Sequence, residues 1–418
     1  MRRREIVFFP PFSVVYFTLL SEAGGIFVFK KKVNINVWLI PLLVIVTMTL
    51  TLISVGWGLH KLTHNVGGTL QFLYTLGKIH SSYVGDYTEK KLFQGAMHGL
   101  VESLDDPYSE YLDEEGFAHL NEMTDGTFGG IGVVLGQRNK EFVVVAPMEG
   151  SPGAKAGIEA GDKILKVNDV DTKGRTLEDV VRTIRGKKGT SVKLLLEHKN
   201  GEQFTADIVR DDIKVKSVAG KMLPDSKIGY IRVSMFNENT GEEFKKAYEK
   251  LEQEGMQATL LDLRRNPGGL LNECVKVANF IVPKGPVVSI TDKKGETKVY
   301  ESKLEKVKYP LAVLIDNGSA SASEIVSGAV QDTKSGKLFG VKTYGKGCVQ
   351  SVFPVTLDTG LKLTTAMYYT PSGRSIHKVG VTPDVEIELP EKATSDVQLK
   401  KAEEYLKEEL AKKSKTEG

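Results

Sequence analysis

The longest apolar stretch of the chain lies close to its N-terminus. Residues 33–59 contain no Asp, Glu, Lys or Arg, and three lysines come directly before them. Trp57 follows Trp38 by 19 residues, which in a helix corresponds to roughly 29 Å, close to the thickness of the hydrocarbon core of a bilayer. Because tryptophan favours both membrane interfaces, the pattern predicts a transmembrane helix over residues 33–60.

Basic residues on the N-terminal side of this stretch set its expected orientation. Residues 2–4 are arginines and residues 30–32 are lysines, so the positive-inside rule places residues 1–32 in the cytoplasm and the chain after His60 outside. A cleaved signal peptide is the competing interpretation, although no A-x-A-like site follows the apolar run. The earlier apolar run, residues 6–20, contains two prolines and is expected to be an interfacial segment or an upstream extension.

Two shorter patterns with helical spacing follow. Within residues 68–123, expected to be a helical part of the protein, apolar residues recur at helical intervals; they are Leu70, Leu73, Leu76 and Ile79, then Leu92, Met97, Leu100, Val101 and Leu104. Both apolar faces are expected to pack, in the simplest case within the chain. The turn-rich segment DDPYSEYL, residues 105–112, has no physical role that its pattern reveals.

Residues 124–212 combine a glycine-rich loop, a strand pattern and a short helix pattern. The loop contains Gly129, Gly130, Ile131 and Gly132, and its backbone N–H groups can bind a carboxylate. The run GSPGAKAGIEAGDKILKVND follows, and residues 177–184 have helical apolar spacing. Together these features closely resemble the PDZ domains of bacterial proteases, which implies that a peptide C-terminus is added as an extra strand, with its carboxylate at the glycine-rich loop.

From residue 213 to residue 390, apolar strand patterns alternate with helical ones. Residues 228–236 predict a strand, residues 240–255 a helix, and residues 258–282 a strand, a turn and a second helix. This alternation predicts a mixed α/β core. Within residues 391–418, a charged amphipathic pattern predicts a C-terminal helix.

One segment of this core moves from strand to helix through three serines. Residues 311–315 are a continuous apolar run, Asn317 and Gly318 favour a turn, and Ser321 precedes a helical pattern. The sequence Ser321-x-x-Glu324 is typical of a capping box, which is the commonplace interpretation. The alternative is a nucleophile, which requires a nearby base, with the helix N-terminus favouring a developing oxyanion.

Composition narrows the function classes. The chain has 418 residues with a formal net charge of +3, so it holds two or three folded units and shows no electrostatic signature of nucleic-acid binding. Its two cysteines, Cys274 and Cys348, lack metal-site spacing, and among its seven histidines only His60 and His64, beside the apolar stretch, form an H-x-x-x-H pair. We expect two isolated core thiols, with a disulfide as the alternative, and no metal or other cofactor.

A base for Ser321 is suggested by TYGKGCVQS, in which Lys346 follows Ser321 by 25 residues and Gln350 follows Lys346 by four. With the SASASE segment, this spacing resembles the carboxyl-terminal processing peptidases, serine proteases with a Ser/Lys dyad and a PDZ domain. The resemblance covers nearly all of residues 68–413. It implies that Ser321 is the nucleophile, Lys346 the general base and Gln350 the residue that orients the lysine. Cys348 departs from the family pattern, where Thr or Ser is expected.

The same resemblance implies an oxyanion hole and an architecture. The turn RNPGG contains Gly268 and Gly269, one of which is expected to supply an N–H group, with the second from Ala322. A tight turn is the simpler explanation for the two glycines. The resemblance implies a crotonase/ClpP-like protease core with the PDZ domain inserted before it, and suggests a homodimer. Lys346 must be neutral to accept a proton, so we expect it to be buried among apolar groups.

The sequence therefore predicts a membrane-tethered, extracytoplasmic endopeptidase that recognises polypeptides with unstructured apolar C-termini, gated by its PDZ domain. A first alternative is a PDZ scaffold with an inactive protease lobe, a binding protein. A second is an α/β hydrolase of small esters that uses His377, the only histidine after the serine segment.

Overall fold

The computed structural model describes residues 17–20, 26–29, 39–138, 140–388, 390 and 395–416. It divides into two compact units, residues 1–89 and residues 90–418. Most of the predicted interfacial segment, residues 6–20, lies outside the described residues, as does Trp38. In the first unit, β1 (Phe17–Leu20) pairs antiparallel with β2 (Ile26–Phe29).

Helix α1 (Leu39–Thr63) carries the long apolar stretch of the first unit. Among the described residues it is the one helix long and apolar enough to cross a membrane or to be a signal sequence. Helix α2 (Val66–Ser82) begins after Asn65, whose side chain accepts a hydrogen bond from Gly68 N–H at 2.8 Å. The predicted apolar helix is therefore present over Leu39–Thr63.

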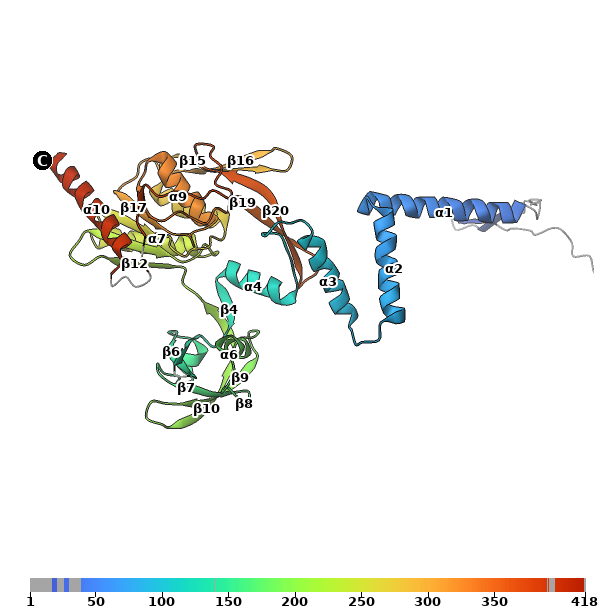
Figure 1. The fold of residues 1–418 in the computed structure, drawn as a ribbon, viewed down its shortest axis with the longest axis horizontal. Coiled ribbons are helices and arrows are strands. Elements are labelled where there is room, and N and C mark those ends of the chain that lie inside the picture. The colour runs from blue at the N-terminus through green and yellow to red at the C-terminus, as the bar shows by residue number, and fades with distance from the viewer. Residues whose placement is uncertain are drawn as a thin grey trace, which may run out of the picture. The chain divides into compact units, whose positions relative to one another are not determined.

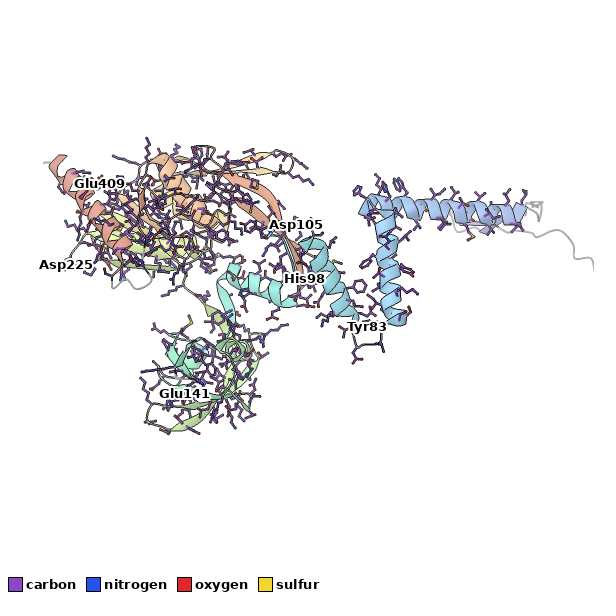
Figure 2. The ribbon with its side chains drawn as sticks, in the orientation of Figure 1. Tyr83, His98, Asp105, Glu141, Asp225 and Glu409 are labelled. Atoms are coloured by element: carbon purple, nitrogen blue, oxygen red, sulfur yellow. The ribbon has the colours of Figure 1, made fainter. Side chains whose placement is uncertain are left out.

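The second unit begins with helices and one short strand. These are α3 (Glu89–Glu102), β3 (Glu110–Leu112) and α4 (Glu114–Asp125). Figure 2 labels His98 on α3 and Asp105 just after it. The Lys90 ammonium lies 2.7 Å from the Glu114 carboxylate, which joins α3 to the start of α4. The two amphipathic helices predicted within residues 68–104 correspond to α2 and α3.

A separate antiparallel sheet follows, with strand order β10-β9-β7-β6-β5 and β8 paired with β7. Its elements are β5 (Val133–Arg138), β6 (Glu141–Pro147), α5 (Pro152–Lys155), β7 (Lys163–Val167), β8 (Val170–Asp171), α6 (Leu177–Ile184), β9 (Ser191–Glu197) and β10 (Gln203–Val209). Alternate residues of β9, including Leu194 and Leu196, share a buried core with Val180 and Ile184 of α6. The predicted helix over residues 177–184 is confirmed.

Two strands lead into and out of this sheet. β4 (Thr127–Gly130) and β11 (Asp211–Lys214) pair antiparallel with each other and belong to none of the three larger sheets. The chain therefore enters and leaves the domain of this antiparallel sheet through one two-stranded connection.

The central sheet of the core has the order β12-β13-β14-β17-β18-β21, and only β12 runs antiparallel to its neighbour. Its strands are β12 (Val218–Met222), β13 (Ile228–Val233), β14 (Ala258–Asp262), β17 (Leu311–Ile315), β18 (Lys337–Gly340) and β21 (Val385–Glu386). Both faces are covered: Leu261 and Val313 share a core with α7 (Thr240–Gln253), α8 (Leu271–Ile281) and α9 (Ala322–Thr333), whereas Leu260 and Leu314 pack with α10 (Val397–Thr416) (Figure 1). β14 and β17 are buried at every position, and burial on both faces explains why β17 is a continuous apolar run.

A second sheet of the core has the order β16-β15-β20-β19, and β3 adds to β20. Its strands are β15 (Gly285–Asp292), β16 (Thr297–Ser302), β19 (Cys348–Pro354) and β20 (Gly360–Tyr369). β19 begins two residues after Lys346, so this sheet holds the lysine segment against α9. The predicted alternation of strands and helices, a mixed α/β core, is confirmed.

Candidate active site

Ser321 lies at a sharp turn between the buried strand β17 and helix α9. Its φ of 53° and ψ of −113° form a backbone conformation that non-glycine residues rarely adopt. The Asp316 carboxylate holds the turn, because its Oδ1 accepts hydrogen bonds from Gly318 N–H at 3.0 Å and from Arg265 N–H at 2.8 Å. A strained serine held by its surroundings is a feature of functional turns.

The three serines of the segment have different surroundings. Ser319 and Ser323 are fully buried, and their hydroxyls donate to the main-chain oxygens of Leu263 at 2.8 Å and Asn266 at 2.9 Å. Ser321 is only partly buried. Ser321 and Glu324 form the predicted capping box at the start of α9. The Glu324 N–H also donates to the main-chain oxygen of Ser321 at 2.8 Å. Among the described residues, Ser321 is the one of the three serines whose hydroxyl donates to no main-chain oxygen.

The Glu324 carboxylate joins the serine turn to the lysine segment. It is fully buried and accepts hydrogen bonds from the N–H groups of Ser321 at 2.8 Å, Gly345 at 2.7 Å and Lys346 at 2.9 Å. The Thr343 hydroxyl also donates to it, at 2.6 Å. Charge-assisted bonds of this kind are the strong ones, so one side chain fixes both segments relative to each other.

Tyr368 makes the same connection from the second sheet. Its hydroxyl lies 3.1 Å from the main-chain oxygen of Ser321 and in short contact with that of Lys346. Burial raises the pKa of Tyr368 well above its usual range, which keeps the phenol neutral and able to donate. The structure therefore brings the predicted nucleophile and base together through two shared partners.

Lys346 is partly buried. Burial lowers the pKa of its ammonium, and the nearby positive charge of Lys362 acts in the same direction. The ring of Tyr108 lies 5.2 Å from its Nζ atom. Among the described residues, no hydrogen bond joins the Lys346 amine to the Ser321 hydroxyl in this structure. Gln350, predicted to orient the lysine, donates instead to Cys348 Sγ and Thr364 Oγ1, both at 3.2 Å.

The predicted oxyanion donors surround Ser321. Gly268 has a φ of 102°, and a side chain there would come within 2.8 Å of Ser321 Cβ and 2.9 Å of Ala322 N, so only glycine fits. Its own N–H donates to Asn266 Oδ1 at 2.9 Å. In the described part of the chain, the N–H groups of Gly269 and Ala322 have no such partner.

His377 does not complete a triad. Its main chain packs against Gly347, where an added Cβ would meet His377 N at 2.5 Å. Its Nδ1 is buried and, among the described residues, has no hydrogen-bond partner. The described residues therefore do not contain a histidine that is oriented by a carboxylate and bonded to the serine.

The predicted peptide-binding loop divides between two structures. Gly129 and Gly130 belong to β4 and pair with β11. The carbonyl of Ile131 accepts from Gly153 N–H at 2.7 Å, and that of Gly132 accepts from Met148 N–H at 2.8 Å. Within the described residues, the N–H groups of Ile131 and Gly132 have no partner. They lie at the start of β5, an edge strand with one side unpaired.

Sequence reasoning missed most of the polar framework. Glu324 was interpreted only as a cap, and Tyr368 and Thr343 were not singled out. The one available signal was the recurrence of small and polar residues around Lys346, which does not say which group they bind. Likewise, nothing local indicated that Tyr108 would lie against Lys346.

The fold and site define a class of protein: a mixed α/β core with a strained serine at a strand-to-helix turn, preceded by a small antiparallel domain with an open strand edge at β5. Comparison with known families agrees. Residues 227–387 match peptidase family S41, residues 143–197 match a PDZ domain, and residues 70–116 match the N-terminal domain of the activating protease CtpB.

Individual relatives are named as proteases of the same kind. The chain is 39% identical over 324 residues to the carboxy-terminal processing protease CtpA of Bacillus subtilis (strain 168), covering 76% of this chain and 69% of that protein. It is 36% identical over 375 residues to a probable CtpA-like serine protease of Staphylococcus aureus (strain COL), covering 86% and 75%. A putative S41 protease from Bacteroides fragilis NCTC 9343 shares the fold, with 17% identity and a TM-score of 0.50 over 77% of this chain and 91% of that chain.

This chain belongs to the PDZ-containing carboxyl-terminal processing peptidases, which are serine proteases of family S41. The predicted family and enzyme class are confirmed.

Proposed function

We propose that the protein is an endopeptidase that cleaves polypeptides through their C-terminal region, with Ser321 as nucleophile and Lys346 as general base. The observation that carries this proposal is the buried Glu324 carboxylate, which binds the main chain of both residues. Burying a carboxylate costs free energy. That cost is explained if the relative position of the two segments matters for function.

The proposed reaction has two acyl-transfer steps. The Ser321 oxygen attacks a peptide carbonyl carbon while the neutral Lys346 amine takes the hydroxyl proton. The carbon–nitrogen bond then breaks, and Lys346 returns the proton to the leaving amine. Water attacks the resulting ester, Lys346 accepts a proton from it, and the Ser321 hydroxyl is restored as the new carboxyl terminus leaves.

Three further features support this chemistry. The lowered pKa of Lys346 increases its neutral fraction at physiological pH. The N–H of Ala322 at the N-terminus of α9, which has no acceptor within the described part of the chain, suits a developing oxyanion. As the second donor we propose Gly269, because the Gly268 N–H would first have to leave Asn266. Gln350 would orient Lys346 only after leaving Cys348 and Thr364, so the present geometry suits a resting state.

We also infer the layout and the partners. The crotonase/ClpP-like core occupies residues 213–390, residues 391–418 contain the C-terminal helix, and residues 124–212 are the PDZ domain that gates the site. Residues 68–123 are the N-terminal helical part of the protease. Residues 33–60 span the cell membrane once, with residues 1–32 in the cytoplasm and the catalytic part outside. The open edge of β5 and the N–H groups of Ile131 and Gly132 suit an apolar C-terminus as ligand.

The test uses the full-length protein in detergent and a peptide with an unstructured apolar tail. Ser321→Ala and Lys346→Ala should each abolish cleavage while the thermal unfolding transition stays within a few degrees of that of the parent. Peptide binding without cleavage by the parent would favour the PDZ scaffold. Cleavage that survives Lys346→Ala but is lost on His377→Ala would favour the ester hydrolase.

A further inference from the structure

The turn-rich segment of residues 105–112 is fixed to the second sheet of the core. The Asp106 carboxylate accepts from Tyr108 N–H at 3.2 Å and from the Ser109 hydroxyl at 2.5 Å. The Ser109 oxygen in turn accepts from Thr364 N–H at 3.0 Å. Asp105, labelled in Figure 2, marks the point where the chain leaves α3 for this turn.

The residues that follow continue the attachment. β3 pairs antiparallel with β20, with Glu110 opposite Lys362, and these two side chains form an ion pair at 2.7 Å. The turn therefore has a defined position relative to the lysine segment, because β20 also pairs with β19, which begins just after Lys346.

This attachment places an aromatic ring against the proposed base. The Tyr108 ring centroid lies 5.2 Å from Lys346 Nζ, within the range of a cation–π contact. The His377 ring meets Tyr108 edge-on, with a centroid separation of 6.3 Å. Tyr108 is partly buried, and burial, followed by the neighbouring Tyr344, raises its pKa. Tyr108 is thus a neutral phenol that covers the amine.

We propose that Tyr108 is a positioning residue for the peptidase reaction: its ring covers the Lys346 amine, excludes water from it and holds it in place by a cation–π contact. The inference rests on the proposed role of Lys346. It gives the segment of residues 105–112 a function, namely to deliver this ring to the site from a distant part of the chain.

The ring has two opposing effects on Lys346. Exclusion of water disfavours the ammonium, whereas the electron-rich face of the ring favours it. The charged and titratable groups that also face Lys346 are Cys348, Lys362, Asp106 and Glu324. A substitution of the Tyr108 side chain removes none of them, so the two effects of the ring can be measured separately.

Three variants separate the effects, with Lys298 and Tyr300 as a matched control pair. Tyr108→Phe keeps the ring. Tyr108→Leu keeps an apolar cover but removes the aromatic face, and Tyr108→Ala opens the pocket to water. The control Tyr300→Leu removes a ring that lies 4.7 Å from Lys298 Nζ, a contact of the same kind on β16.

The first readout is the pH profile of kcat/KM for the full-length protein. Because the base must be neutral, activity rises with pH through the Lys346 pKa. Tyr108→Leu should move this limb to lower pH by roughly half a unit to one and a half units, since the ammonium loses its cation–π contact. Tyr108→Ala should move it to higher pH and lower the plateau by up to about 100-fold. Tyr108→Phe and Tyr300→Leu should leave the limb in place.

The second readout does not need catalysis. In a Ser321→Ala background, the rate of Lys346 acetylation by acetic anhydride is followed by mass spectrometry across the same pH range. Displacements in the same order as above support the inference even if the parent cleaves no peptide, in which case the proposed function alone fails. If the labelling profiles of the parent, Tyr108→Leu and Tyr108→Phe superimpose, the inference is overturned. This outcome is decisive even if the parent is active and even if Tyr108→Ala does not fold.

Discussion

The polar groups of the serine turn are hydrogen-bonded within the protein, whereas those at the open edge of β5 in the PDZ domain are not. At the serine turn, one buried carboxylate accepts four hydrogen bonds from Ser321, Thr343, Gly345 and Lys346. At the open edge of β5, the carbonyls of Ile131 and Gly132 are bonded, but their N–H groups and the edge itself have no partner among the described residues. Chemistry requires groups that are fixed before substrate arrives, whereas strand addition requires groups that are still free.

The largest effect should come from fixing the charge of the proposed base. Lys346→Arg keeps a cation but cannot become neutral, because arginine stays protonated in proteins. We expect kcat/KM to fall by about 10⁴-fold or more at every pH. Steady-state cleavage of a tailed peptide from pH 6 to pH 10 measures this. Substantial activity in the arginine variant would show that residue 346 does not act as a base.

Next in size is the link between the two segments. Glu324→Ala leaves the N–H groups of Ser321, Gly345 and Lys346 without their buried acceptor, so kcat/KM should fall by roughly 100-fold or more. Unfolding free energy should drop by about 3 kcal/mol, measured by urea denaturation.

Gln at position 324 is the matched control for this link. Glu324→Gln keeps one acceptor oxygen but turns a donor toward N–H groups, so we expect an intermediate loss. Wild-type activity in both variants would mean that the two segments need no shared carboxylate.

A smaller effect should come from the loop at the open edge of β5. Gly132 has a φ of 69°, and a side chain there would lie 2.4 Å from Ser151 Cβ. Gly132→Val should therefore distort the loop and lower kcat/KM about tenfold for a peptide with a free apolar C-terminus. A short peptide that does not reach the edge of β5 should be cleaved at an unchanged rate. An equal loss of kcat/KM for both peptides would show that the edge of β5 and the serine turn are not separate in function.

The smallest effect should come from Cys348, which departs from the family pattern. Its thiol is buried, its pKa is raised by burial, and it accepts a hydrogen bond from Gln350. Cys348→Thr supplies a hydroxyl as acceptor instead, and we expect less than about a threefold change in kcat/KM. A larger loss of kcat/KM would show that the thiol orients Gln350 in a way that a hydroxyl cannot.

Much of the fold was predictable because its patterns are local. The apolar run of residues 311–315 is strand β17, residues 177–184 are helix α6, and residues 240–255 contain helix α7. Burial of the central sheet on both faces produces continuous apolar strands, and exposure of one helix face produces helical spacing. These signals need no knowledge of distant contacts.

The chain alone also pointed to Ser321 and Lys346, since the residue types and their separation appear together in TYGKGCVQS and SASASE. It did not reveal that the hydroxyls of Ser319 and Ser323 donate to the main chain of the neighbouring turn. Those bonds depend on Leu263 and Asn266, whose carbonyls accept them. Nor did it show that Gln350 lies with Cys348 and Thr364 in this structure.

Short-range order along the chain thus determined the elements and the family, and it predicted Ser321 and Lys346 as the reactive groups. Tertiary structure decided what surrounds those groups: a carboxylate at position 324 shared by two segments, a tyrosine hydroxyl from β20, and the ring of Tyr108 brought from the turn after α3. The reason is physical, because the reactivity of an amine or a hydroxyl depends on burial and on neighbouring dipoles, and those neighbours come from residues far apart in sequence.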